Sequence, residues 1–152
     1  AAYEQACKLD DDSSIGAAAR VSLGWLCLGD GKVDPAQQLW HEVVSKWSNT
    51  PEAAEACLAL GDSLFQHGQT KAAEAAWLQG VHEQVADGWS YSPARLRMRL
   101  AEQYSRTGRL QEAAQLYGEC LGKLRISQQD RERVLRAVAE LAARGEQRPE
   151  RP

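Results

Sequence analysis

Several features that mark membrane proteins, secreted proteins and sheets are missing from this sequence. Its 152 residues contain no apolar run of the length, about 18 residues, that a membrane-spanning helix needs. No basic segment leading into an apolar one opens the chain, as it would in a signal peptide. Runs that alternate Val or Ile with polar residues are also absent, so we expect an all-α chain without strands, membrane spans or a secretion signal.

Residue patterns that carry catalysis or bind metals are equally scarce. The histidines His41, His67 and His82 lack the i,i+3 or i,i+4 spacing of paired zinc ligands, and the cysteines form no C-x-x-C. There is no glycine-rich phosphate loop and no serine in a nucleophile elbow. The sequence therefore predicts no enzyme, no metal site and no cofactor.

What the sequence does contain is a four-residue frame that occurs three times. A Leu is followed by Gly after eight residues, by Ala after thirteen and by Trp or Tyr after seventeen. The copies lie 37 and 40 residues apart and are Leu23/Gly31/Ala36/Trp40, Leu60/Gly68/Ala73/Trp77 and Leu100/Gly108/Ala113/Tyr117. Intervals of this size are typical of repeat proteins in which each repeat is one helical hairpin.

Each position of the frame has a physical role in a hairpin. Gly readily adopts the left-handed conformation that ends a helix, so each frame Gly predicts a turn. The Ala and the aromatic residue share one face of the second helix, where a small residue beside a large one permits close packing. Asp34-Pro35, Thr50-Pro51 and Ser92-Pro93 predict N-caps, each followed by Pro at the first helical position.

With these residues the chain resembles the tetratricopeptide repeat family, whose pattern combines Leu-Gly, Gly, Ala-x-x-x-aromatic and Pro on a helix-turn-helix unit. Leu23-Gly24 and Leu60-Gly61 match the opening pair, whereas Leu100-Ala101 departs from it, and the repeats exceed the family's length of about 34 residues. The resemblance covers roughly residues 15–122. It implies a right-handed α-solenoid of stacked antiparallel helix hairpins, but no particular pathway.

We expect one solenoid domain over residues 1–145 and a flexible tail at 146–152. Its hairpins are predicted at about 15–47, 51–86 and 93–125, with a capping helix at about 128–144 that begins after Ser127. The helices are predicted near 15–29, 35–47, 51–66, 71–86, 93–106, 110–124 and 128–144. Residues 3–10 resemble the end of a helix from an earlier repeat, which predicts that the chain is a fragment.

The four cysteines, at positions 7, 27, 57 and 120, are widely spaced. Cys27, Cys57 and Cys120 stand where the family places small or packing residues, so we expect buried free thiols rather than disulfides. Free thiols favour a reducing compartment, which predicts the cytoplasm or the nucleus. The periplasm is the alternative, because residues 40–53 and the 37-residue period also resemble tetratricopeptide proteins of bacterial envelopes.

Charge is divided unequally along the chain. Residues 1–90 carry 5 basic and 13 acidic residues, a net charge of −8, whereas residues 91–152 carry 13 and 8, a net charge of +5. Twelve of the 13 cations in the basic part are Arg, which is suited to bidentate contacts with carboxylate or phosphate. The alternative for the arginines from Arg131 onward is a solvated helix face with i,i+4 ion pairs.

The resemblance also implies where a partner would bind, because the first helix of each tetratricopeptide hairpin lines a concave groove. Helical phase places these residues on the groove side: Val21, Trp25 and Leu28, then Leu58, Asp62 and Phe65, then Arg95, Met98, Arg99, Glu102 and Arg106. Large apolar side chains at such positions usually mark a binding site. The alternative is that they pack between neighbouring first helices.

We hypothesise a protein-interaction scaffold or adaptor that binds a partner protein or peptide segment in this groove. Apolar anchors of the partner would contact Trp25, Leu28 and Phe65, and its acidic residues would pair with the groove arginines. One alternative is a structural segment of a larger solenoid, which includes self-association into a homo-oligomer. Another is nucleic-acid binding through the Arg-rich C-terminal third.

Overall fold

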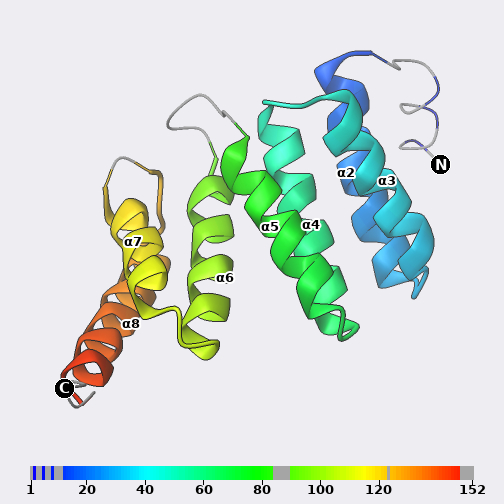
Figure 1. The fold of residues 1–152 in the computed structure, drawn as a ribbon. Coiled ribbons are helices and arrows are strands. Elements are labelled where there is room, and N and C mark those ends of the chain that lie inside the picture. The colour runs from blue at the N-terminus through cyan, green and yellow to red at the C-terminus, as the bar shows by residue number, and fades with distance from the viewer. Residues whose placement is uncertain are drawn as a thin grey trace. The chain divides into compact units, whose positions relative to one another are not determined.

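The computed structural model describes residues 2, 5, 8, 12–83, 90–122 and 124–147. Every regular element in this part of the chain is a helix, and the helices that follow residue 12 are α2 (Ser14–Gly29), α3 (Val33–Lys46), α4 (Pro51–Gln66), α5 (Thr70–His82), α6 (Ser92–Arg106), α7 (Leu110–Leu121) and α8 (Gln128–Glu146) (Figure 1). The all-α prediction is confirmed.

The predicted helix ends agree with the structure to within two residues at most positions. The exceptions are α5, which ends at His82 rather than 86, and α7, which ends at Leu121 rather than 124. Cys7, most of the helix predicted at residues 3–10 and most of the tail predicted at 146–152 lie outside the described residues.

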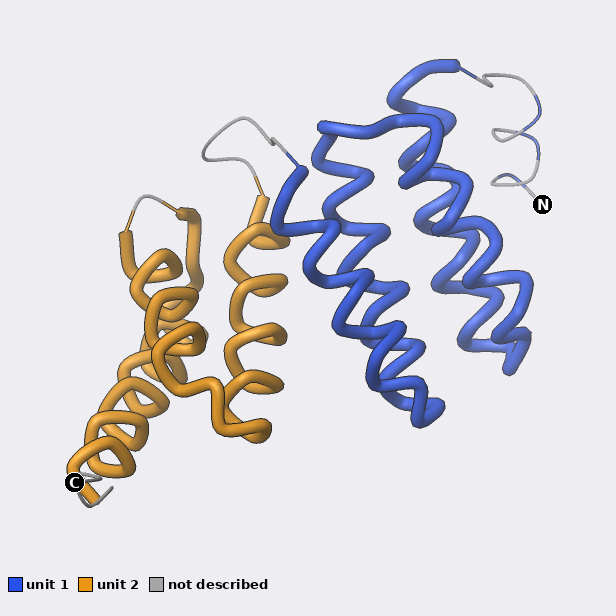
Figure 2. Tube along the Cα trace, viewed as in Figure 1, with its two compact units in different colours: residues 1–86 blue, residues 87–152 orange. Residues whose placement is uncertain are grey.

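The chain divides into two compact units, residues 1–86 and residues 87–152 (Figure 2). In the first unit the hairpins α2–α3 and α4–α5 are stacked, because α4 packs against α3 and also contacts α2. In the second unit α6 and α7 form the third hairpin, and α8 packs against α7. The single domain expected over residues 1–145 stays a prediction.

The turn of each hairpin is formed as the frame glycines predicted. Gly31, Gly68 and Gly108 have φ values of 76°, 77° and 81°, in the left-handed region where a side chain would be strained. The backbone N–H of the residue after each Gly donates a hydrogen bond to a carbonyl near the end of the first helix. An example is Lys32 N, which donates to Cys27 O at 2.8 Å. The second helix therefore begins a fixed short distance after the Gly.

This geometry explains why only one of the three predicted Pro-linked caps is correct. Thr50 caps α4, since its Oγ1 accepts from Ala53 N at 3.2 Å and Pro51 is the first helical residue. Asp34 is not a cap, because the turn at Gly31 starts α3 one residue earlier, at Val33. Ser92 is not a cap either, because it is already the first residue of α6, after Tyr91. The Ser127 cap is confirmed by Asp130 N, which donates to Ser127 Oγ at 3.1 Å.

The frame aromatic residues fill the core of each hairpin. Trp40 and Trp77 are buried, and their Nε1 atoms donate to Val21 O at 3.3 Å and to Asp62 Oδ1 at 3.1 Å. A β-carbon added to Gly24 would overlap the Trp40 indole, and one added to Gly61 would overlap the Trp77 indole. The Gly of each Leu-Gly pair is therefore required, because any side chain there would occupy the space that the Trp indole fills.

An ion pair recurs in the first and third hairpins at the same frame positions. Arg20 Nε donates to Glu42 Oε1 at 2.9 Å, and Arg97 Nε donates to Glu119 Oε2 at 2.7 Å. Each Arg also donates to the carbonyl four residues earlier in its helix. Each pair links the first helix of its hairpin to the second.

Candidate protein-interaction surface

The first unit presents an exposed aromatic side chain that is fixed in place. Trp25 is 44% exposed, yet its ring packs edge-on against buried Trp40, with the centroids 5.1 Å apart and the planes at 62°. Phe65 is half-buried and packs on Trp77, with the centroids 5.7 Å apart and the planes at 41°. The two groove aromatics of the first unit thus each rest on the frame Trp of their own hairpin. Such contacts restrict the rings before any partner arrives.

The remaining groove positions of the first unit differ in exposure. Leu28, Leu58 and Asp62 are half-buried and reach the surface. Val21 is only 3% exposed, so the expectation that it contacts a partner is wrong. The residue belongs to the core, and its carbonyl accepts a hydrogen bond from the Trp40 indole N–H at 3.3 Å. Its burial favours the alternative of packing, which stays a prediction as regards the neighbouring first helix.

One acidic residue belongs to the same face of α4 but was missed in the sequence. Glu55, Leu58, Asp62 and Phe65 follow one another at i, i+3, i+7 and i+10, the spacing of one helix face. Burial and the neighbouring charge of Glu52 raise the pKa of Glu55. We call the set Trp25, Leu28, Glu55, Leu58, Asp62 and Phe65 the α2–α4 surface.

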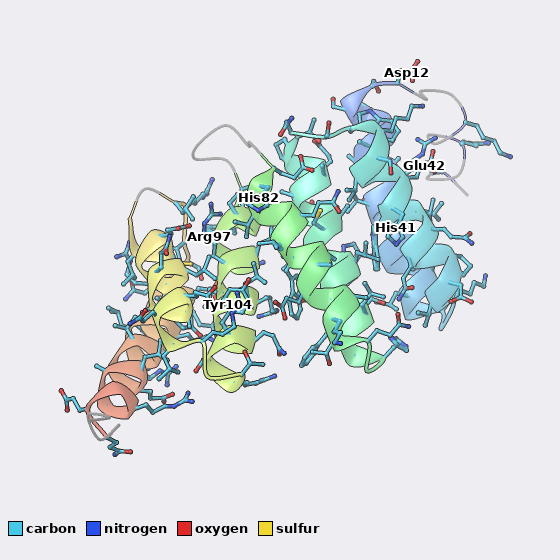
Figure 3. All side chains as sticks on the ribbon, in the orientation of Figure 1. Asp12, His41, Glu42, His82, Arg97 and Tyr104 are labelled. Atoms are coloured by element: carbon cyan, nitrogen blue, oxygen red, sulfur yellow. The ribbon has the colours of Figure 1, made fainter. Side chains whose placement is uncertain are left out.

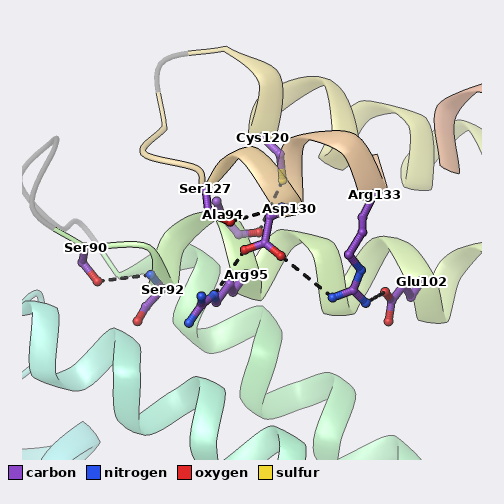
Figure 4. A network of polar contacts seen from close by, with 9 residues as sticks. All are labelled: Ser90, Ser92, Ala94, Arg95, Glu102, Cys120, Ser127, Asp130 and Arg133. Carbon is purple, nitrogen blue, oxygen red and sulfur yellow. Dashed lines mark hydrogen bonds and ion pairs between the residues drawn. The ribbon is translucent and has the colours of Figure 1, made fainter. Parts of the chain in front are cut away.

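In the second unit two of the five predicted groove residues of α6, Arg95 and Glu102, form ion pairs with α8. Arg95 Nε donates to Asp130 Oδ2 at 3.4 Å (Figure 4). Arg133 pairs with two carboxylates: its Nη1 lies 3.9 Å from Asp130 Oδ1 and its Nη2 lies 3.5 Å from Glu102 Oε1 (Figure 4). Basic and acidic side chains therefore alternate from Arg95 to Glu102. The carboxylate that Arg95 was expected to receive from a partner is thus supplied within the chain.

The other three predicted residues of α6 are placed differently from one another. Met98 is 2% exposed, so its predicted contact with a partner is wrong; it lies beneath a cavity of about 230 Å³ that Tyr117 and α8 also line. Arg99 is half-buried and Arg106 is exposed. Their predicted contact with a partner stays a prediction. The cavity rim holds Glu102, Glu140, Arg133 and Arg136, whose charges balance, so it selects neither anions nor cations.

The side chains that could bind a metal are dispersed in the part of the chain that the structure describes. His41 and His82 lie apart on the exposed faces of α3 and α5 (Figure 3), and no three His, Cys, Asp or Glu side chains of the described residues gather as metal ligands. Cys57 and Cys120 are buried free thiols as predicted, whereas Cys27 is free and half-buried. None of the described helices combines the length and apolar character needed to span a bilayer.

Stacked antiparallel hairpins with an aromatic core and left-handed glycine turns define an α-helical repeat protein. The sequence model of the tetratricopeptide repeat matches residues 22–88 and, overlapping them, residues 58–122, which is more than half of the chain. The chain belongs to the tetratricopeptide repeat family, and the hairpin architecture implied by the resemblance is confirmed.

Two solved structures are similar in fold. Both are of the nearly identical TPR-like repeats of a Podosopora anserina protein assigned as a kinesin light chain, one of them a single-residue variant. The variant aligns with a TM-score of 0.66 at 22% identity over 95% of this chain and 74% of that one. The second aligns with a TM-score of 0.58 at 20% identity over 95% and 83%. A comparison with curated proteins gave no match.

Proposed function

We propose that the chain is a protein-interaction scaffold whose α2–α4 surface binds a segment of a partner protein. The observation that carries the proposal is Trp25, which is 44% exposed while its ring is fixed against Trp40. An exposed aromatic ring that is already ordered loses little conformational entropy on binding, and such residues dominate binding energies.

The partner segment carries apolar side chains that cover Trp25, Leu28 and Phe65. These residues come from α2 and α4, neighbouring first helices that contact each other, so one segment can reach them all. In the second unit Arg99 and Arg106 remain the proposed contacts for acidic groups, while Asp130 and Arg133 already engage Arg95 and Glu102. We place the chain in the cytoplasm or nucleus, with the periplasm as the alternative, and assign it no enzymatic activity.

Affinity capture from a cell extract tests this function. The wild-type chain is compared with Trp25→Ala/Phe65→Ala and with Leu78→Ala, a matched control because Leu78 is 40% exposed but lies on α5. Circular dichroism establishes that all three remain helical. The proposal expects one protein to be retained by the wild type and the control and lost from the double variant.

Equal recovery of the same protein by the double variant would contradict the proposal and place the binding face elsewhere. Recovery of nucleic acid alone, released by salt, would favour the alternative function of the Arg-rich second unit.

A further inference from the structure

We infer that an exposed face of α8 is a self-association surface, on which two copies of the chain pair through antiparallel α8 helices. Helix α8 packs against α7, and its residues Val134 and Leu141 are buried. A different face of the helix stays open: Leu135 is 51% exposed, and its neighbours there are half-buried or exposed. We call this face the α8 stripe, and it consists of Arg131, Leu135, Val138, Ala139, Ala142 and Glu146.

The part of α6 that corresponds to the α8 stripe is covered by a helix. The Leu-Ala pair at 141–142 of α8 repeats the pair at 100–101 of α6, 41 residues later, and the same shift places Leu135 at the position of Ala94. Ala94 is 1% exposed, and its carbonyl accepts from Cys120 Sγ of α7 at 3.4 Å. Leu135 carries the larger apolar side chain, so a helix in the same place would bury more surface on α8.

The sequence does not supply this covering helix by the route that the three hairpins use. In each hairpin a Gly follows the frame Leu after eight residues and forms a left-handed turn. Eight residues after Leu141 the sequence has Pro149, and Pro restricts φ to about −65°. The sequence therefore predicts no left-handed turn that folds a following helix back onto α8, which favours an occupant from another molecule.

The α8 stripe is complementary to itself when two copies run antiparallel. A two-fold axis that crosses the helix between Val138 and Ala139 brings each residue opposite the one that lies equally far from the axis in the partner copy. Leu135 then faces the partner's Ala142, so a large side chain meets a small one. The contact forms twice, once on each side of the axis.

The same axis pairs the charges at the two ends of the stripe. Arg131 and Glu146 lie equally far from the axis on opposite sides, so Arg131 of each copy faces the partner's Glu146. Two parallel α8 helices in register would instead bring Arg131 against the partner's Arg131, and Glu146 against the partner's Glu146, which is repulsive. The charges therefore select the antiparallel orientation.

The spacing of the stripe fits helix pairing, and its size sets the strength. Positions 131, 135, 138 and 142 follow i, i+4, i+7 and i+11, the period of 3.5 residues at which two helices pack along their length. From residue 131 to residue 146 the stripe is about 22 Å long at 1.5 Å per residue. One such helix from each copy buries a small area, and the second units, each with a net charge of +4, repel each other, so we expect a weak dimer.

Sedimentation equilibrium of the whole chain tests the inference. Over concentrations from about 1 μM to about 1 mM, which span the dissociation constants of weak complexes, the average mass should rise from 16.7 kDa towards twice that value. Leu135→Lys should weaken the dimer by at least about tenfold, because it puts a cation into both apolar contacts. Circular dichroism establishes that each variant remains helical.

Charge reversal then tests the orientation. Arg131→Glu and Glu146→Arg each place like charges across the axis twice, so each should weaken the dimer by at least about threefold. The combination Arg131→Glu/Glu146→Arg exchanges the two charges and should restore the wild-type affinity. Arg136→Glu is the matched control, because it makes the same change of charge at an exposed residue of α8 outside the stripe and should leave the affinity unchanged.

The inference does not depend on the α2–α4 surface and fails on its own terms. A wild type that stays monomeric at every concentration would overturn it and assign the α8 stripe to a different protein or to another segment. A dimer that Leu135→Lys leaves intact would overturn it by placing the contact elsewhere. A double charge variant that associates as weakly as the single ones would contradict the antiparallel pairing.

Discussion

Gly61 lies against the Trp77 indole so closely that a β-carbon there would overlap the ring, and Gly24 stands in the same relation to Trp40. The third hairpin replaces Gly by Ala101 and Trp by Tyr117, and both remain buried. The smaller phenol ring leaves room for the methyl group that the indole excludes. At the residue scale, the one departure from Leu-Gly is therefore explained by the aromatic residue opposite it.

Gly61→Ala should lower the free energy of unfolding by about 1–3 kcal/mol, because the methyl group must displace the buried Trp77 ring. Urea unfolding followed by circular dichroism measures the loss. Gly61→Ala/Trp77→Tyr recreates the pair of the third hairpin, so it should be less destabilised than the two single changes added together. Simple additivity would contradict the steric explanation.

Buried thiols give the protein a predicted weakness in alkaline solution. Burial raises the pKa of Cys57 and of Cys120 from 9.0 to about 12, and it raises that of Tyr117 from 10.0 to about 12. Between pH 9 and 12 the unfolded chain releases these protons first, so the stability that these three groups contribute is present below pH 9 and is lost as the pH rises towards 12.

Thermal unfolding across this range measures the effect. Cys57→Ala/Cys120→Ala should start from a lower Tm but decline less steeply with pH, because two of these three buried groups with raised pKa values are gone. An unchanged slope would contradict the assignment to the thiols.

At the scale of the element, the sequence predicts which segments are helical more accurately than it predicts the residue that caps each helix. The Leu-Gly-Ala-aromatic frame predicted the hairpins and their turns because it records contacts within about twenty residues of chain. Thr50, Asp34 and Ser92 carry the same local signal, an oxygen followed by Pro, yet only Thr50 caps a helix. The backbone conformation of the turn before each helix determines where the helix starts. An oxygen-bearing residue followed by Pro does not specify that conformation.

Ser127→Ala should destabilise α8 and lower the free energy of unfolding by about 1 kcal/mol, because its Oγ accepts from Asp130 N at the helix start. Ser92→Ala is the matched control, since its side chain makes no capping hydrogen bond and the loss should be smaller. Urea unfolding compares the two. A larger loss for Ser92→Ala would contradict the assignment of Ser127, and not Ser92, as a helix cap.

At the scale of the whole molecule, the candidate site was only partly predictable. Helical phase alone placed Trp25 and Phe65 on the groove side, but it could not separate them from Val21 and Met98, which lie at the edge of the same stripes and are buried. The pairs formed with α8 depend on side chains 31 to 35 residues apart, as in Arg133 with Glu102 and Arg95 with Asp130. Such distances along the chain exceed what one helical pattern records.

The net charge of each unit bears on the partners that it would attract. The two units differ in sign, with net charges of −7 for residues 1–86 and +4 for residues 87–152. Acidic partners of the second unit should therefore bind more weakly to the Arg99→Glu variant.

The most direct test of binding at the α2–α4 surface is the NMR signal of the Trp25 indole N–H during titration with a peptide taken from the captured partner protein. Trp40, Trp47 and Trp77 donate their indole N–H groups to acceptors within the protein, so they serve as internal references. If the α2–α4 surface binds the segment, the Trp25 signal should move most and should follow the binding curve. A peptide that binds at saturating concentration while the Trp25 signal stays fixed would contradict binding at this surface.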